Sequence, residues 1–287
     1  MVKRSAPDRV FDGIVVVALI FIGLFALVPL LVVVSASLTP YSEVLANGGY
    51  VLFPTSFTLE GYIAMWNTTQ IPRAMLVSTF VTVVGTALNM VLSTGLAWPL
   101  SRKEMPGRSF ILLALVFTTV FNAGIIPTYL IVKETGLLNS IWAMIIPSAL
   151  SVFNVFIMKT FFEGLPSELS ESARLDGAGE LRLLLQIIFP LAVPVLLTIG
   201  LFYAVANWNT FFAAIFYVRD ASLQPLQVVL RDLLTSNIEA AFDPDEVTPA
   251  LTLRMAAVVI TALPMIIVYP FIQKHFQKGV LIGSVKS

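Results

Sequence analysis

Six long apolar stretches, separated by polar segments, constrain this chain more than any other feature of its sequence. A helix needs about 20 predominantly apolar residues to cross the hydrocarbon core of a bilayer, and each stretch is long enough. The sequence therefore predicts an all-α, polytopic membrane protein with six transmembrane helices. The predicted spans are 13–38, 72–100, 109–132, 140–161, 189–217 and 250–272.

Composition supports this class and excludes others. The chain is 57% hydrophobic and 12% charged, too apolar for a soluble domain. Its 17 basic and 17 acidic residues cancel, and no basic run exceeds two residues, so we expect no nucleic-acid partner. With no cysteine and a single histidine, His275, the chain offers no disulfide, and we expect no metal site.

The sequence also lacks the machinery of an enzyme. A serine nucleophile needs an activating base, and His275 has no evident partner for that role. No glycine-rich Walker-type phosphate loop is present. We therefore expect that the chain has no catalytic residues, holds no cofactor and does not hydrolyse ATP itself.

The polar segments divide the chain into a lead at 1–12, a transmembrane domain at 13–272 and a tail at 273–287. The first span exceeds the roughly 7–15 apolar residues of a signal peptide, which predicts an uncleaved anchor. A polar loop at 218–249 is long enough for a short helix, expected around 226–234.

Lysine and arginine are distributed unevenly among the loops. With both termini inside, the cytoplasmic side carries twelve of the 17 basic residues and the outer side five. Cytoplasmic loops of membrane proteins carry this excess, so we expect both termini and the charged loop at 163–188 in the cytoplasm.

That loop contains the signals of a short helix. Ser167 is expected to cap the first turn, where Glu168 and Glu171 lie near the positive end of the helix dipole. Gly177 is expected to end the helix, because glycine enters the left-handed conformation readily. The sequence predicts a helix from Glu168 to Asp176.

Residues 171–178, ESARLDGA, followed by 187–190, IIFP, resemble the EAA loop of permease subunits from bacterial ATP-binding cassette (ABC) importers. The family pattern is Glu-Ala-Ala, two residues, Asp-Gly-Ala, then Ile-x-Leu-Pro, and the chain departs from it at Ser172 and Phe189. The resemblance implies that this loop couples the permease to an ATPase subunit. The residues implied in coupling are Glu168, Glu171, Ser172, Ala173, Asp176, Gly177, Ala178 and Pro190.

Over its whole length the chain is similar to the carbohydrate-uptake branch, the family of the maltose importer's smaller permease. The tail, from 269 to 286, is similar to the subgroup serving oligosaccharide importers, including those for uronate oligomers such as alginate. The resemblance implies the type I ABC importer permease fold in a bacterial cytoplasmic membrane. It also implies a second, homologous permease, two ATPase subunits that bind ATP and Mg, and an extracytoplasmic solute-binding protein.

Amide side chains are the polar groups deep in the predicted spans. An amide both donates and accepts hydrogen bonds, which suits sugar hydroxyls, and an indole can stack on a sugar ring. Each asparagine can equally hold two helices together, and both interpretations stay open. The candidate pathway residues are Asn89, Asn122, Asn154, Asn207, Trp208 and Asn209.

Other classes of function also stay open. The predicted spans have no ionisable side chain near their centres, which disfavours a proton-driven carrier. Sodium coupling through backbone oxygens needs no such residue, so a stand-alone secondary transporter is an alternative. Further alternatives are an ABC permease for a solute other than sugar and a membrane-bound scaffold or enzyme. An ATPase that copurifies with the chain would favour the importer.

Overall fold

The computed structural model describes residues 6–68, 70–235 and 250–284, and these residues form helices and no strands. The expected all-α class is confirmed. The chain divides into two compact units. The first comprises Met1–Ile71 and Leu230–Leu263, and the second Pro72–Val229 and Pro264–Ser287. Parts of the expected outer loop (236–249), lead (1–5) and tail (285–287) lie outside the described residues, as does the side chain of His275.

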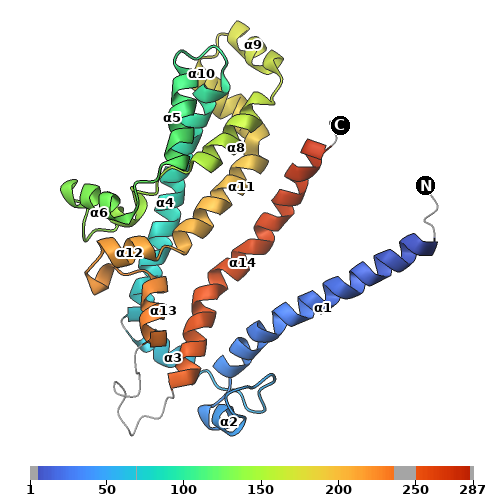
Figure 1. Ribbon diagram of the computed structural model, residues 1–287, viewed down its shortest axis with the longest axis vertical. Coiled ribbons are helices and arrows are strands. Elements are labelled where there is room, and N and C mark those ends of the chain that lie inside the picture. Colours follow the sequence, from blue (N-terminus) through green and yellow to red (C-terminus); the bar gives the residue numbers. More distant parts are fainter. Residues whose placement is uncertain (1–5, 69, 236–249, 285–287) are drawn as a thin grey trace. The chain divides into compact units, whose positions relative to one another are not determined.

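The first unit is built around the N-terminal helix α1, Ala6–Ser37 (Figure 1). Its apolar segment Phe11–Ser37 is long enough to cross a membrane, and none of its most apolar window is buried within the chain. Two short helices follow, α2 (Tyr41–Ala46) and α3 (Glu60–Asn67). Gly61 of α3 lies against α14 (Ala250–Ser284), where an added Cβ would come 3.4 Å from Thr252.

The second unit holds most of the remaining helices. It begins with the long helix α4, Gln70–Ser101, which starts just before the unit boundary. The helices that follow are α5 (Arg108–Val120), α6 (Ile125–Glu134), α7 (Trp142–Ile145), α8 (Val152–Glu163), α9 (Ser167–Leu175), α10 (Glu180–Arg182), a π-helical turn (Leu183–Ile188), α11 (Phe189–Trp208), α12 (Phe212–Tyr217), a 3-10 turn (Ala221–Leu223) and α13 (Leu226–Thr235). α13 confirms the short helix expected around 226–234.

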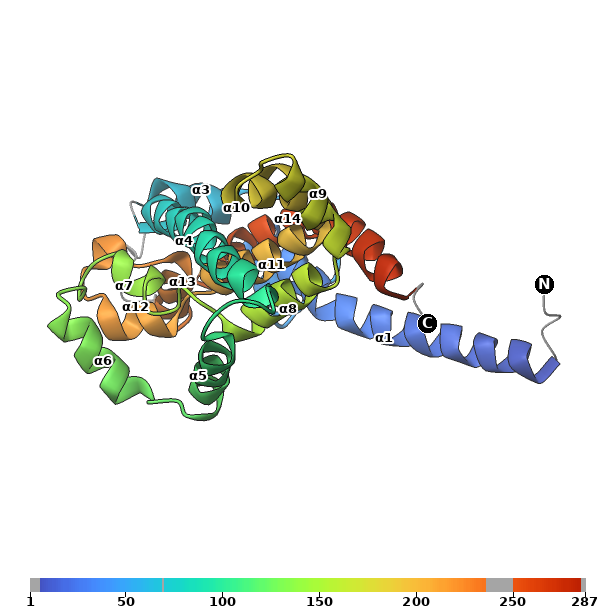
Figure 2. The same cartoon turned by 90° about the horizontal axis from the view of Figure 1, so that it is seen from above.

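A buried core joins α4, α8 and α11 near the end of the unit that carries α9 and α10 (Figure 1). Trp98 of α4 packs edge-on against Phe162 of α8, with ring centroids 5.6 Å apart. Leu183 and Ile188 of the π-helical turn and Ala173 of α9 are buried in the same core. Seen from above, α8 lies beside α11 (Figure 2). The short helix α9 is therefore packed against the ends of longer helices.

Four helices in the described part of the chain are long and apolar enough to cross a membrane. They are Phe11–Ser37, Gln70–Ser101, Glu180–Trp208 and Leu251–Val268, and a fifth candidate is the pair α5 and α6, bent by 117°. The number of six spans stays a prediction.

The structure interrupts three of the expected spans. The third, 109–132, is bent between Val120 and Ile125, where Gly124 has a φ of +84°. The fourth, 140–161, is two helices separated at 146–151, a segment that contains Pro147. Proline has no N–H to donate, so Pro147 cannot continue the hydrogen-bond pattern of α7. The fifth begins earlier than expected, at Glu180, and its helix ends at Trp208 rather than near Tyr217.

Candidate functional site

Helix α9 is a short helix with a defined end. Ala178 donates its N–H to the carbonyl of Ala173 at 2.9 Å, and Gly177 donates to that of Arg174 at 3.0 Å. Gly177 has a φ of +77°, which completes the Schellman type of helix ending. The expected helix and the role of Gly177 as its stop are confirmed.

The start of α9 differs from the expectation. Ser167 is the first helical residue and does not cap the helix, because Pro166 occupies the cap position. No side-chain hydrogen bond caps this end. Proline has no polar side chain, but its extended backbone, with a ψ of 132°, turns the chain into the helix. The prediction of a serine cap was wrong by one residue.

The two faces of α9 differ in character. Ser170 and Ala173 are buried, with 6% and 5% of their surface exposed. On the opposite face Glu168, Glu171 and Leu175 are exposed, and Leu175 is 89% exposed. This exposed face therefore combines two carboxylates with one large apolar side chain. This face is available to another protein.

The predicted coupling residues differ in how exposed they are. Ala173 is buried in the core, Ala178 packs against it, and Pro190 lies in the first turn of α11. The exposed members are Glu168, Glu171, Ser172, Asp176, Gly177 and Pro190. These side chains are accessible to a partner in this conformation, whereas Ala173 is buried and Ala178 half-buried.

Arg102 holds the buried face of α9 in place, and it is not among the coupling residues predicted from the sequence. Its Nη2 donates to the hydroxyl of Ser170 at 3.0 Å, and its guanidinium lies 4.0 Å from the ring centroid of Trp98. Burial lowers the pKa of Arg102, and Glu180 raises it in part. The sequence did contain one signal for the contact between Arg102 and Trp98. Residues four apart lie on the same face of a helix, and Arg102 follows Trp98 by four.

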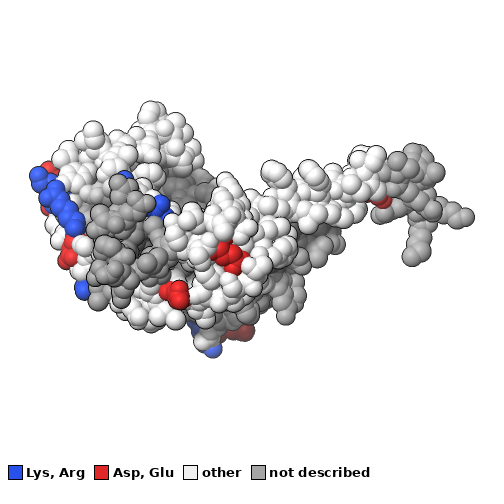
Figure 3. All heavy atoms as spheres, turned by 90° about the horizontal axis from the view of Figure 1, so that it is seen from below, with Lys and Arg blue, Asp and Glu red and all other residues white. Residues whose placement is uncertain are grey.

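A second ion-pair group supports the same end of the unit. Glu163 at the end of α8 accepts from Arg108 of α5 at 2.6 Å and from Lys159 at 2.8 Å. Partial burial raises the pKa of Glu163, but the hydrogen bonds from Lys159 and Arg108 outweigh it and hold the pKa below its ordinary value. On the face drawn in Figure 3, most of the described surface is uncharged.

Two of the candidate amides, Asn89 and Asn207, meet beside the broken fourth span. Asn89 of α4 donates to the carbonyls of Ser148 and Ala149, at 3.2 and 2.6 Å, within the non-helical segment. Asn207 of α11 donates to Asn89 at 2.9 Å and to Thr86 at 3.2 Å. Unpaired carbonyls are costly at membrane depth, so Asn89 stabilises the interruption between α7 and α8.

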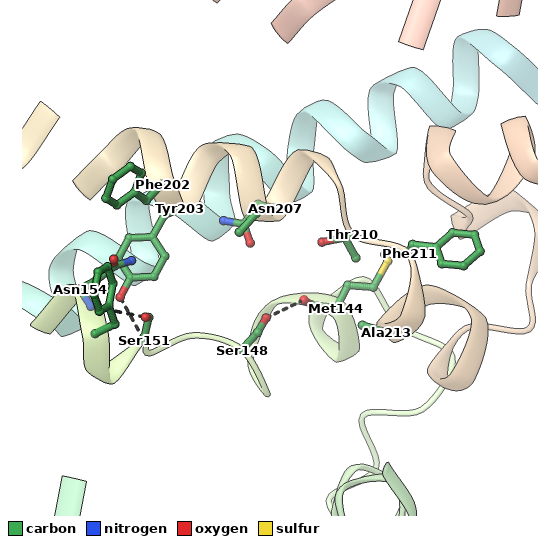
Figure 4. Close-up of a pocket in the computed structure, with 12 residues that line it drawn as sticks. Met144, Ser148, Ser151, Asn154, Phe202, Tyr203, Asn207, Thr210, Phe211 and Ala213 are labelled. Carbon is green, nitrogen blue, oxygen red and sulfur yellow. Dashed lines mark hydrogen bonds between the residues drawn. The ribbon is translucent and has the colours of Figure 1, made fainter. Parts of the chain in front are cut away.

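A cavity of about 590 Å³ lies beside this network, between α8 and α11 (Figure 4). Asn154 and Asn207 are the two candidate amides that line it. The other lining residues are Met144, Ser148, Ser151, Phe153, Phe202, Tyr203, Ala206, Thr210, Phe211 and Ala213. Its volume falls within the range of about 300–1,000 Å³ typical of small-molecule sites.

The remaining candidates lie elsewhere. Asn122 accepts from the N–H of Gly124 at 2.8 Å, at the bend between α5 and α6. Asn209 donates to the carbonyl of Val205 at 2.8 Å at the end of α11. Trp208 is buried and lines a separate hollow of about 200 Å³ that includes Thr79. None of these three lines the cavity that contains Asn154.

Broken helices beside a cavity lined by amide, hydroxyl and apolar side chains, together with a short exposed helix, are features of membrane transport permeases. The chain belongs to the family described as binding-protein-dependent transport system inner membrane components, whose model matches residues 1–282. The resemblance to ABC importer permeases is confirmed.

Two relatives from Bacillus subtilis strain 168 are similar over nearly their full length. The polygalacturonan/rhamnogalacturonan transport system permease protein YtcP is 42% identical over 284 residues, which cover 97% of this chain and 99% of the relative. Protein LplC is 42% identical over 287 residues, 99% and 97% of the two chains.

A solved structure shows the same fold. The crystal structure of a bacterial ABC transporter involved in the import of the acidic polysaccharide alginate contains a chain that is 30% identical and superposes with a TM-score of 0.88. The match covers 96% of this chain and 100% of the other. The type I permease fold implied by the EAA-like loop is therefore confirmed.

Proposed function

We propose that this chain is one of two homologous permease subunits of an ABC importer. The proposed substrate is an oligosaccharide built from uronate sugars. Two relatives support this class, because they are named for transport of polygalacturonan and for import of alginate, both acidic polysaccharides. In this proposal separate ATPase subunits bind ATP and Mg and hydrolyse it, and the chain itself has no catalytic residue.

The observation that carries the proposal is the exposed face of α9, held rigidly to the ends of longer helices. Glu171 and Leu175 on that face contact an ATPase subunit. Ala173 and Ser170 on the buried face connect α9 to the core and to Arg102. A movement of the ATPase is then transmitted to α4 and α8, because the contacts between them are packed and hydrogen-bonded.

The remaining partners follow from the family. A solute-binding protein delivers the sugar at the outer face, and the loop at 218–249 extends toward it. The membrane is the cytoplasmic membrane, both termini lie in the cytoplasm, and the tail from residue 273 approaches the ATPases. Among the candidate amides we propose Asn154 and Asn207 as sugar contacts, because both line the cavity. The side chain of Asn89, by contrast, already donates to the carbonyls of Ser148 and Ala149.

The test uses the complete complex of two permeases and two ATPases in lipid vesicles with the binding protein. Oligogalacturonate, an alginate oligosaccharide and a neutral malto-oligosaccharide of equal length are supplied in turn. We expect a binding protein loaded with a uronate oligosaccharide to stimulate ATP hydrolysis and to drive ATP-dependent uptake. Uptake by this chain alone in a sodium gradient, without ATP, would instead identify a secondary transporter.

A further inference from the structure

The cavity between α8 and α11 has polar groups that no other part of the described chain uses. The side-chain amide of Asn154 makes no hydrogen bond within the described residues, although Asn154 is 5% exposed and lines the cavity. Asn207 uses its amide nitrogen for Thr86 and Asn89, which leaves its oxygen Oδ1 free to accept. Amides in such positions normally bond to protein, water or a ligand, so these groups are available to a polar ligand that enters the cavity.

Three other polar side chains on the wall bond within the described chain. The hydroxyl of Tyr203 pairs with that of Ser93 at 2.6 Å and accepts from the N–H of Ser151 at 3.0 Å. The hydroxyl of Ser151 accepts from the N–H of Asn154, and that of Ser148 donates to the carbonyl of Met144. These bonds leave the amides of Asn154 and Asn207 and the hydroxyl of Thr210 available to a ligand.

Aromatic rings accompany the amides. Phe202 and Tyr203 lie on α11 near Asn154, and Phe211 lies just beyond the end of α11, at the far end of the cavity from Asn154 (Figure 4). Phe202 is 40% exposed and Phe153 is 67% exposed, so both offer ring surface that the chain does not cover. Aromatic faces beside amide donors and acceptors suit a pyranose ring, which has apolar C–H faces and a rim of hydroxyl groups.

The cavity wall carries no ionisable acid or base apart from the phenol of Tyr203. None of the twelve lining residues is lysine, arginine, histidine, aspartate or glutamate. Such a wall offers a carboxylate no cation and therefore no charge-assisted hydrogen bond. The wall therefore contacts hydroxyl groups and ring faces, and the negative charge of a uronate must be balanced outside it.

We propose that this cavity is a sugar-ring site that recognises one pyranose through hydroxyl contacts to Asn154 and Asn207, and leaves the uronate carboxylate to the second permease or to water. The inference rests on the proposed function and deepens it, because it divides recognition of an acidic sugar between two subunits. In this proposal the chain contacts the hydroxyl groups and C–H faces of the sugar ring.

The test introduces a negative charge into the wall. Asn154→Asp is nearly isosteric, and the amide that it replaces has no side-chain partner to lose among the described residues. In the complete importer we measure uptake of an oligogalacturonate and of its methyl ester, which has the same ring and no charge. The same binding protein serves every variant, so its preference cancels in the ratio of variant to wild type.

We expect Asn154→Asp to reduce uptake of the free acid about tenfold more than that of the ester, because the introduced carboxylate repels a nearby uronate. Asn154→Leu removes the contact without adding charge and should reduce both to a similar degree. The matched control is Asn67→Asp, the same change at an exposed position of α3 that does not line the cavity, which should leave the ratio of acid to ester unchanged.

Four outcomes are distinguished. Wild-type uptake in both Asn154 variants overturns the site, as does an equal loss of acid and ester uptake in Asn154→Asp. If the wild-type complex takes up neither sugar in the presence of ATP, the proposed function is itself wrong. An acid-selective loss in Asn154→Asp, with no such loss in Asn67→Asp, supports the site.

Discussion

Arg102 donates a hydrogen bond to the hydroxyl of Ser170 at 3.0 Å, and this bond joins the end of α4 to the buried face of α9. The same guanidinium lies 4.0 Å from the centroid of the Trp98 ring, so two contacts hold one side chain. Trp98 in turn packs against Phe162 of α8. The short helix α9 is thereby connected through one arginine to two long helices.

We predict that Arg102→Ala uncouples ATP hydrolysis from transport. The loss of a hydrogen bond from a charged group costs about 1.5–3 kcal/mol, and the cation–π contact about 0.5–1 kcal/mol more. The measurement is uptake per ATP hydrolysed in the reconstituted complex. Ser170→Ala, which removes only the hydrogen bond, should show a smaller effect in the same direction, and normal coupling in Arg102→Ala would refute the role of this contact.

Glu171→Lys should weaken assembly with the ATPase. If Glu171 pairs with an ATPase arginine, the variant replaces attraction with repulsion at a cost of about 2–5 kcal/mol. The yield of ATPase that copurifies with the tagged permease reports the loss. Glu104→Lys changes another exposed acid outside α9 and should leave that yield unchanged. Charge reversal of the ATPase arginine should partly restore assembly.

Gly85→Ala should disturb the amide network. An added Cβ would lie 2.9 Å from Nδ2 of Asn207, so the amide must move away from Asn89. Crowding of this kind costs about 1–3 kcal/mol. Gly95→Ala, on the same helix with nothing within 4 Å of the added Cβ, is the matched control. We expect a lower melting temperature and less uptake only for Gly85→Ala, and equal behaviour of the two variants would contradict the close approach.

Glu43 should confer pH dependence on the loop between α1 and α3. Hydrogen bonds from the Ser56 and Thr55 hydroxyls and from their backbone N–H groups lower its pKa to about 2. A carboxylate with a lowered pKa stabilises the folded loop above its ordinary pKa of 4.5, and that stability is lost as the pH falls toward 2.

The loop should therefore be unchanged between pH 8 and pH 5 and should loosen below about pH 4. A carbon-13 label on the Glu43 carboxyl reports the titration directly. Glu43→Gln should raise hydrogen exchange at Thr55 and Ser56 even at neutral pH, whereas Glu60→Gln should not. A midpoint near 4.5 for Glu43 would show that these bonds do not form in solution.

A reporter fused after Arg182 should read cytoplasmic, and one inserted near Asp243 should read external. The reason is the placement of twelve of the 17 basic residues on the inner side, which cytoplasmic loops favour. An alkaline phosphatase and fluorescent protein pair at each site makes the measurement. The reverse reading at both sites would rule out the proposed orientation.

The sequence by itself determined the membrane class, the helical fold and the position of α9. These features depend on local properties: the length of each apolar stretch, and a glycine at the position where a helix must turn left-handed. Gly177 needs no distant partner to end α9, so the motif could be read directly from residues 171–178. The sequence placed the cap at Ser167, one residue after Pro166, because the start of this helix is less sharply marked in the sequence than its glycine end.

Only the tertiary structure decided where the apolar stretches break and which amides face a cavity. Hydropathy does not reveal the interruption at 146–151, because its carbonyls are satisfied by Asn89, far away in the chain. Arg102 and Ser170, and likewise Asn89 and Asn207, are joined by hydrogen bonds between helices. Such pairings depend on how helices pack, and spacing along one helix does not encode them.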